Sequence, residues 1–436
     1  MSINMNKSIL ISVLLLSMPL AQATPDIEHW QTSRGIDVYF VQADELPMVD
    51  VQLVFDAGSA RDGDKPGLAN LTLNLLDDGA AGMSGDEIST VFESVGARYG
   101  ASLDQDMAQL TLRSLTAPEP LATAVDMLRK VMSQPDFPER DVARERQRTL
   151  TGIQARWQSP GAVAADAFFK TLYGEHPYGH PKAGTVASVE ALTRADLVGF
   201  YQRHFHSANA MVAIVGALPR SEAEQLAEDI TADLPAGEPL PALPAVEPAD
   251  AQQVTISFPS AQTHILLGTP LLQRDDPDYF PLYVGNHVLG GGGMVSRLFE
   301  TIREDRGLSY SVYSYMMPLQ QPGPFVAGLQ TSTEQAEAAL ALLREQIKLF
   351  IANGPNEAEL KSSIQNITGG FPLRIDSNSN IIGYLAMLGF YDLPLDYLDT
   401  FKARVEAVTA EQIVDAFQRR LSLDDFVTVL VGREDE

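Results

Sequence analysis

The chain has 436 residues, with 31 Lys and Arg against 57 Asp and Glu, which gives a formal net charge of −26. This acidity argues against nucleic acid as a partner, because phosphate binding needs a basic surface. The sequence contains no cysteine, which excludes disulfides, a thiol nucleophile and a lipid-anchored cysteine. The length suggests more than one domain, and a hydrophobic content of 45% is ordinary for a globular protein with a core.

Residues 1–23 have the pattern of a secretory signal peptide. Lys7 precedes an apolar run from Ile9 to Leu16, and Ala21-Gln22-Ala23 fits a small-x-small cleavage site. The apolar run is too short to span a bilayer, and no later segment reaches spanning length without charges. We therefore expect a secreted, periplasmic protein without a membrane span.

The segment GLANLTLNLLDDG, residues 67–79, predicts a short helix. Its leucines recur at helical spacing, and the run stops at Asp-Asp-Gly. Asn70 and Asn74 are four residues apart and therefore share one face. Two histidines at this spacing, with a glutamate between them, would bind zinc, whereas asparagine amides are poor zinc ligands. The pattern fits either an ordinary core helix or a catalytic helix that has lost its chemistry.

The chain contains an internal repeat. Residues 191–216 align without gaps on residues 407–432, and both copies predict a helix followed by an apolar strand that ends at glycine. A weaker match places residues 88–104 on residues 295–311. Chance similarity between two amphipathic helices would not readily produce two matches in the same order. The repeat therefore indicates two homologous halves.

A proline-rich segment separates these halves. Residues 234–250 hold five prolines, which makes this stretch a stiff, extended connector. We expect the halves at 24–234 and 250–436, with a linker at 235–249.

Strands and helices mix within each half. Strands are predicted at 50–58, 108–115, 263–272 and 325–331, and helices at 119–132 and 333–354. The fold class expected is therefore α+β, in which each half is a mainly antiparallel sheet layered with helices.

Two features of the second half could carry chemistry. Gly290, Gly291, Gly292 and Gly293 form either a turn between helices or a loop that lets another backbone approach closely. Arg303 lies in the last turn of a helix expected to end at Gly307, and Tyr310 follows on a strand. Considered alone, Arg303 is an arginine at a helix C-terminus, where the helix dipole favours a positive charge. Tyr310, considered alone, is a half-buried tyrosine on a strand. The weaker repeat match places Gly96 and Leu103 at their positions, so the scaffold requires neither a guanidinium nor a phenol there.

Four segments together resemble the pitrilysin/insulinase family of zinc metallopeptidases, in its bacterial branch related to the mitochondrial processing peptidase. They are residues 67–79, 172–205, 289–315 and 389–401. The family's zinc motif HxxEH falls on Asn70, Leu73 and Asn74. The third zinc ligand, a glutamate on a later helix, falls near Thr151. The resemblance therefore implies that this chain has no catalytic residue for zinc chemistry and binds no metal.

The resemblance also implies which residues bind substrate. In this family an arginine and a tyrosine of the second half bind the peptide backbone, and they match Arg303 and Tyr310. The four glycines are expected along the peptide's path. In heterodimeric members one subunit keeps the zinc and the other keeps this pair. We therefore predict the non-catalytic, peptide-binding subunit of a secreted heterodimeric zinc peptidase, whose homologous partner carries the zinc. The alternative is a non-proteolytic peptide-binding or assembly scaffold.

Overall fold

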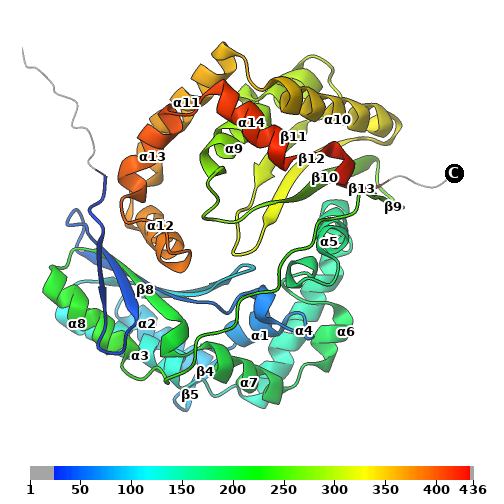
Figure 1. Cartoon of the computed structure of the whole chain (residues 1–436). Helices are drawn as coiled ribbons and strands as arrows, with labels where there is room; N and C mark the ends of the chain where they lie inside the picture. The colour runs from blue at the N-terminus through cyan, green and yellow to red at the C-terminus, as the bar shows by residue number, and fades with distance from the viewer. Residues whose placement is uncertain (1–23, 433–436) are drawn as a thin grey trace, which may run out of the picture.

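The computed structural model describes residues 24–432. Two sheets, each covered by helices, form the two halves of the chain, as Figure 1 shows. The α+β fold predicted from the sequence is therefore confirmed. The expected signal peptide at 1–23 lies outside the described residues. Within residues 24–432, no helix combines the length and apolar character that a membrane-spanning segment needs.

The first sheet has six strands in the order β1-β2-β8-β3-β7-β6. All neighbours are antiparallel except β2 and β8. Its strands are β1 (Glu28–Gln31), β2 (Asp37–Gln42), β3 (Met48–Phe55), β6 (Arg98–Leu103), β7 (Ala108–Leu115) and β8 (Ala210–Gly216). A separate small hairpin joins β4 (Gly79–Ala80) to β5 (Met83–Ser84).

The second sheet has five strands in the order β11-β12-β10-β13-β9, and only β13 and β9 are parallel. Read from the other end, this order repeats β2-β8-β3-β7-β6 of the first sheet, with its parallel pair in the same place. Its strands are β9 (Gln253–Ile256), β10 (Gln262–Leu272), β11 (Ser311–Met316), β12 (Gly323–Ser332) and β13 (Val427–Val431). The shared strand order supports the duplication inferred from the sequence.

Helices follow the strands in both halves. Those of the first half are α1 (Leu68–Leu73), α2 (Gly85–Ser94), α3 (Pro118–Ser133), α4 (Glu139–Arg156), α5 (Pro160–Tyr173), α6 (Val186–Ala191), α7 (Arg194–His204) and α8 (Arg220–Thr231). Those of the second are α9 (Tyr279–Asn286), α10 (Ala336–Asn353), α11 (Glu357–Gly370), α12 (Asn378–Phe390), α13 (Tyr397–Glu406) and α14 (Ala410–Arg420).

The strong repeat has a local physical basis. Thr193 and Thr409 are the N-caps of α7 and α14, and each forms a capping box with the residue three positions later. Each helix leads into one strand of the parallel pair of its sheet, β8 or β13. The repeated residues therefore set the start of equivalent helices and strands.

The structure shifts the weaker repeat by four residues relative to the match of residues 88–104 with residues 295–311. That match pairs Gly307 with Gly100, but Gly307, with φ of 61°, ends a helix, and so does Gly96, with φ of 67°. Counted from these glycines, the positions of Arg303 and Tyr310 fall on Phe92 and Tyr99, and not on Gly96 and Leu103. Gly307 is matched with a glycine in either alignment, Gly100 or Gly96, so sequence identity alone could not decide between the two alignments.

The two halves exchange helices. α5, from the first half, packs on β10 and β13 of the second sheet, and α12, from the second half, packs on β2, β3 and β8 of the first sheet (Figure 1). One hydrophobic cluster accordingly mixes Tyr39 and Met211 of the first sheet with Leu385 of α12. Neither sheet is fully covered by its own half.

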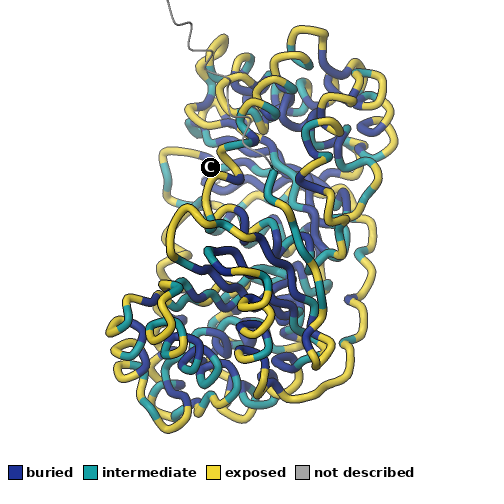
Figure 2. Tube along the Cα trace, turned by 90° about the vertical axis from the view of Figure 1, so that its left-hand side faces the viewer, coloured by how far each residue is buried: buried dark blue, intermediate teal, exposed yellow. Residues whose placement is uncertain are grey.

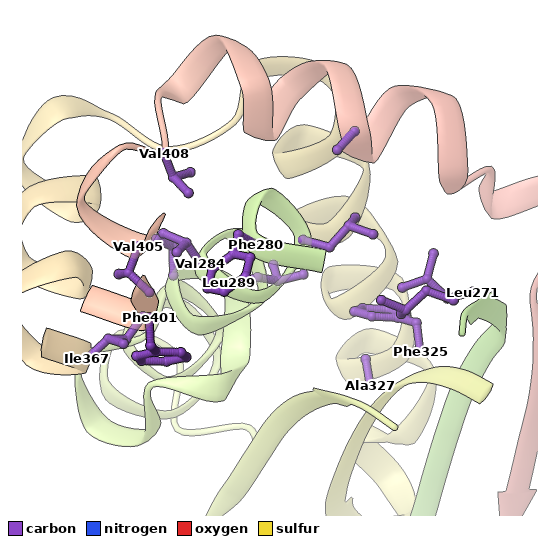
Figure 3. Close-up of a cluster of buried hydrophobic side chains, with 14 of the residues drawn as sticks. Leu271, Phe280, Val284, Leu289, Phe325, Ala327, Ile367, Phe401, Val405 and Val408 are labelled. Carbon is purple, nitrogen blue, oxygen red and sulfur yellow. The ribbon is translucent and has the colours of Figure 1, made fainter. Parts of the chain in front are cut away.

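The core of the second half lies between β10, β12 and the helices around α9. Figure 3 shows Phe280, Val284 and Leu289 packed towards Phe401 and Val405 of α13, with Phe325 beside the sheet. The connector between the halves, residues 235–249, contains no helix or strand and is mostly exposed, as the tube in Figure 2 shows. Arg61 and His176 hold it against the first half by bonding the carbonyls of Pro241 and Pro244.

A buried polar node also joins the halves. Asp106 is fully buried and accepts hydrogen bonds from the Tyr178 hydroxyl at 2.6 Å, the Tyr391 hydroxyl at 2.9 Å and the Gln320 amide at 2.8 Å. Tyr178 belongs to the first half, and Gln320 and Tyr391 belong to the second. Burial raises the pKa of Asp106 to about 6 in spite of these bonds.

Candidate functional site

The helix that carries Asn70 and Asn74 begins at Gly67, whose φ of 93° few other residues adopt. The Asp62 carboxylate fixes this start by accepting the amide N–H groups of Gly67 and Ala69, at 2.7 and 2.6 Å. The α-helix ends at Leu73, earlier than the leucine pattern predicted, and the chain then continues in tighter turns.

Asn70 and Asn74 both line a cavity of about 400 Å³ between α1, β6 and α5. Leu73, at the family's general-base position, is only 1% exposed and belongs to the core of the first half. The prediction that the two asparagines share one face is therefore confirmed, and Leu73 is a core residue. Among residues 24–432, no group of three or more His, Asp and Glu side chains could hold a metal ion.

The α4 residue that reaches Asn74 is Glu145. Its carboxylate accepts Asn74 Nδ2 at 3.1 Å and both Nε and Nη2 of Arg148, at 2.6 and 2.8 Å. The expected position, Thr151, is exposed, and its hydroxyl bonds the Gln147 carbonyl of its own helix. The sequence held a signal for Glu145, because it follows Val142 by three residues on the buried stripe of α4.

Glu145 and Arg148 form a charge group with Asp77, which follows α1. Burial is the main cause that raises the pKa of Asp77 to about 6; the charges of Asp78 and Glu145 add to it, and Arg148 opposes it. Beside the position where the family would hold zinc, this chain thus has an ion pair between Arg148 and Glu145, with the Asp77 carboxyl group nearby.

The predicted arginine and tyrosine lie in contact. Arg303 is carried by the π-helical segment η6 (Phe299–Glu304), and its Cζ lies 4.5 Å from the Phe299 ring centre and 4.7 Å from that of Tyr310. Within the described residues its guanidinium has no carboxylate partner, although acidic residues surround it in sequence. Tyr310 is 77% exposed. The pair therefore presents hydrogen-bond donors that the fold does not use.

The counterparts in the first half have a structural role. Phe92 and Tyr99 stack with ring centres 5.5 Å apart, and Phe92 is buried. In both halves a helix residue thus contacts an aromatic residue of the chain that follows it, Tyr99 within β6 and Tyr310 just before β11. Only in the second half is this contact made by an arginine and an exposed tyrosine.

The four glycines lie between two short helical segments, η4 (His287–Gly291) and η5 (Gly293–Val295). Gly290 is buried, and a Cβ there would come within 2.5 Å of the Ser314 amide nitrogen in β11. This is the close backbone approach that the sequence left as one of two explanations. Gly293, with φ of 60°, has no neighbour within 4 Å of an added Cβ.

One feature was missed from the sequence. β6 is an edge strand that pairs only with β7, and Ala101, Ser102 and Leu103 of β6 line the cavity that holds Asn70 and Asn74. An exposed edge can add an extended peptide as a further strand. The alternation in residues 98–103 is weak, so this strand could be recognised only from its pairing.

Comparisons with known proteins agree with this arrangement. The profile described as "Insulinase (Peptidase family M16)" matches residues 38–186, and that described as "Peptidase M16 inactive domain" matches residues 191–367. A crystal structure of a peptidase M16 inactive domain from Pseudomonas fluorescens is 38% identical, with a TM-score of 0.91, and the match covers 94% of this chain and 99% of that chain.

Two curated relatives carry different descriptions. A "non-peptidase homolog YmxG" of Helicobacter pylori is 23% identical over 98% of this chain and 99% of its own length. An "uncharacterized zinc protease" of Streptomyces coelicolor is 28% identical over 80% of this chain and 78% of its own. Similarity of this kind thus spans proteins described as peptidases and one described as a non-peptidase.

Proposed function

Because this chain belongs to the insulinase family, peptidase family M16, we propose that it is the non-catalytic, peptide-binding subunit of a secreted zinc peptidase. A homologous subunit with an intact HxxEH motif supplies the zinc ion, its activated water and the general base. The observation that carries the proposal is the contrast between two sites. Asparagines replace the zinc-binding histidines, whereas Arg303 and Tyr310 are present, in contact and, among residues 24–432, unpaired with any carboxylate.

The pair suits a peptide backbone. Arg303 stays charged at any physiological pH, and the rings of Phe299 and Tyr310 hold its planar fork in place. It can donate to a peptide carbonyl, and the exposed Tyr310 hydroxyl can donate to a second oxygen. The free edge of β6 offers main-chain hydrogen bonds to an extended chain. An extended peptide, and not a folded protein surface, is the ligand that these groups fit.

The test is reconstitution with the zinc-carrying homologue encoded in the same genome. The mixture should cleave peptides that neither protein cleaves alone. Arg303→Ala should lower kcat/KM by a factor on the order of 100, since a charged contact to the reacting peptide is lost. Arg303→Lys should restore only part of this, because an ammonium lacks the planar fork.

The matched control is Arg140→Ala, which removes an exposed arginine in the first turn of α4. It should leave kcat/KM within about threefold of the original value, because Arg140 lines neither the cavity that holds Asn70 and Asn74 nor the contact between Arg303 and Tyr310. A complex that forms and cleaves peptides at the original rate with Arg303→Ala would contradict the role of the pair. A chain that never associates with the homologue would favour the scaffold alternative.

The proposal also includes secretion. It rests on the signal-peptide pattern at residues 1–23. Cell fractionation with N-terminal sequencing should recover a periplasmic protein that begins at Thr24. Recovery of the uncleaved chain from the cytoplasm would contradict this part.

A further inference from the structure

A second cavity, of about 180 Å³, lies between α5 and the strands β10, β11 and β12. Its lining includes the rings of Phe169, His264, Tyr313 and Tyr315 and carries no Asp, Glu, Lys or Arg, although the chain as a whole is strongly charged. The residues that matter here are Gly161, Phe169, His264, Tyr313, Tyr315 and Gln330. We refer to this cavity as the aromatic pocket.

Two glycines allow the rings of the aromatic pocket to lie where they do. A Cβ at Gly161, in the first turn of α5, would lie 3.2 Å from the His264 ring. A Cβ at Gly328 of β12 would lie 2.7 Å from the Tyr313 hydroxyl. Larger residues at either position would push a ring into the cavity, so the opening depends on the absence of side chains there.

Three polar side chains of the aromatic pocket have no hydrogen-bond partner among residues 24–432. They are those of His264, Tyr313 and Tyr315, and the two tyrosine rings stack with centres 6.0 Å apart. Burial lowers the pKa of His264 below its ordinary value and raises that of Tyr315 to about 12, so both are neutral at pH 7. Such neutral groups at the wall of a cavity are available to a ligand with its own polar atom.

The pocket adjoins the proposed peptide site. Ala165 and Phe169 of α5 line both the aromatic pocket and the cavity that holds Asn70 and Asn74. Ser311, which lines the aromatic pocket, directly follows Tyr310. A peptide that contacts Tyr310 and continues towards β6 would therefore pass the mouth of the pocket.

We propose that the aromatic pocket binds a tyrosine side chain of the extended peptide and makes this subunit selective for tyrosine. The inference rests on the proposed peptide-binding function. An apolar cavity of about 150 Å³ is known to accept a benzene ring, so the volume suits a phenol. Phe169, Tyr313 and Tyr315 supply the ring contacts, and His264, Gln330 and the hydroxyl of Tyr315 supply polar atoms for the phenolic hydroxyl. Phenylalanine would fill the same space but leave those atoms unpaired.

The experiment measures peptide binding to the full chain by fluorescence anisotropy. The probes are labelled decapeptides of Ala and Ser with a single Tyr placed at each position in turn, with matching Phe and Ala peptides. At one position Tyr should lower Kd about tenfold relative to Phe, as one added hydrogen bond to a neutral partner provides. The Ala peptide should bind more weakly than the Phe peptide.

Two kinds of variant test the location. Gly161→Leu should fill the pocket and remove the preference for Tyr while the Ala peptide still binds; Gly152→Leu is the matched control, since an added Cβ there has no neighbour within 4 Å. Tyr315→Phe keeps the ring and should reduce only the Tyr-over-Phe ratio. If Gly161→Leu fails to fold, Tyr315→Phe and His264→Phe carry the test, because each removes a polar atom without removing the ring.

The outcomes are distinct. Equal affinity for Tyr, Phe and Ala peptides would overturn the tyrosine pocket and leave the peptide-binding function in place. A Tyr preference that survives both Gly161→Leu and Tyr315→Phe would also overturn it. Absence of any peptide binding would overturn the pocket together with the proposed function.

Discussion

Leu73 shows how far the zinc-motif helix has changed. Asn70 and Asn74 still line a cavity, so histidines there would point into open space. Leu73 instead packs in the core of the first half and is 1% exposed. The general-base position has therefore become part of the hydrophobic core, which restoring two histidines would not reverse.

Leu73→Glu should lower the free energy of unfolding by about 3 kcal/mol or more, because it places an unpaired carboxylate in the core and removes a buried leucine. Chemical denaturation at pH 7 measures this change. Asn70→His is the control and should stay within about 1 kcal/mol, since its side chain lies in a cavity. Equal unfolding midpoints for the two variants would show that position 73 still faces the cavity.

The glycine-rich run combines two different requirements. Gly290 is needed because β11 approaches its Cα, whereas Gly293 is needed only for its backbone angle. The run therefore holds the outer edge of β11 at one end and exposes Met294 and Val295 at the other. Gly291 and Gly292 are confined as well, since a Cβ at either would lie 2.7 Å from a neighbour, Asn286 Nδ2 or the His287 carbonyl oxygen. Only Gly293 has open space around it.

Gly290→Ala should destabilise the protein more than Gly293→Ala. The first places a Cβ within 2.5 Å of Ser314 and forces the π-helix away from β11. The second adds only the cost of a left-handed backbone angle, about 1 kcal/mol. Thermal unfolding of both variants gives the comparison, and a smaller loss at Gly290 than at Gly293 would contradict the close approach.

The sequence identified these segments well where the signal was local. Alternating apolar residues located β3, β7, β10 and β12, and Asn353-Gly354 marked the end of α10. It failed where the deciding contact was distant in sequence. The Glu145 partner of Asn74 and the open edge of β6 depend on which chains lie side by side, and no spacing within 98–103 or 139–156 encodes that.

The buried polar node between the two halves contains a carboxyl group, Asp106, that changes its protonation state near pH 6. Asp106 has a raised pKa of about 6 against an ordinary value of 3.8, chiefly because it is buried between the halves, while nearby Asp104 raises it further. Tyr178, Tyr391 and the Gln320 amide face it and favour its charged form, but do not offset burial. Between pH 3.8 and about 6, position 106 therefore holds more bound proton in the folded chain than in the unfolded chain.

Asp106 should therefore lower the free energy of unfolding by about 3 kcal/mol as the pH rises from about 4 to 6. Above pH 6 its contribution should level off. The Asp106→Asn variant has no titrating group at this position. Its free energy of unfolding should therefore decrease less than that of the original protein over the same pH range, even if the variant is less stable at pH 4. Urea unfolding at half-unit intervals between pH 4 and 7.5 measures both profiles. Parallel profiles would show that Asp106 is ionised throughout.

The exchange of α5 and α12 bears on how the chain folds during synthesis. When residue 250 leaves the ribosome, β2, β3 and β8 are complete, but the helix that covers them, residues 378–390, has not yet been made. The apolar face of the first sheet must stay uncovered while more than a hundred further residues are added at about 5–20 residues per second. A nascent chain therefore exposes an apolar sheet face for many seconds, and this is the kind of surface that holding chaperones bind. The finished protein, in turn, cannot be divided at its proline-rich connector into two independently soluble pieces.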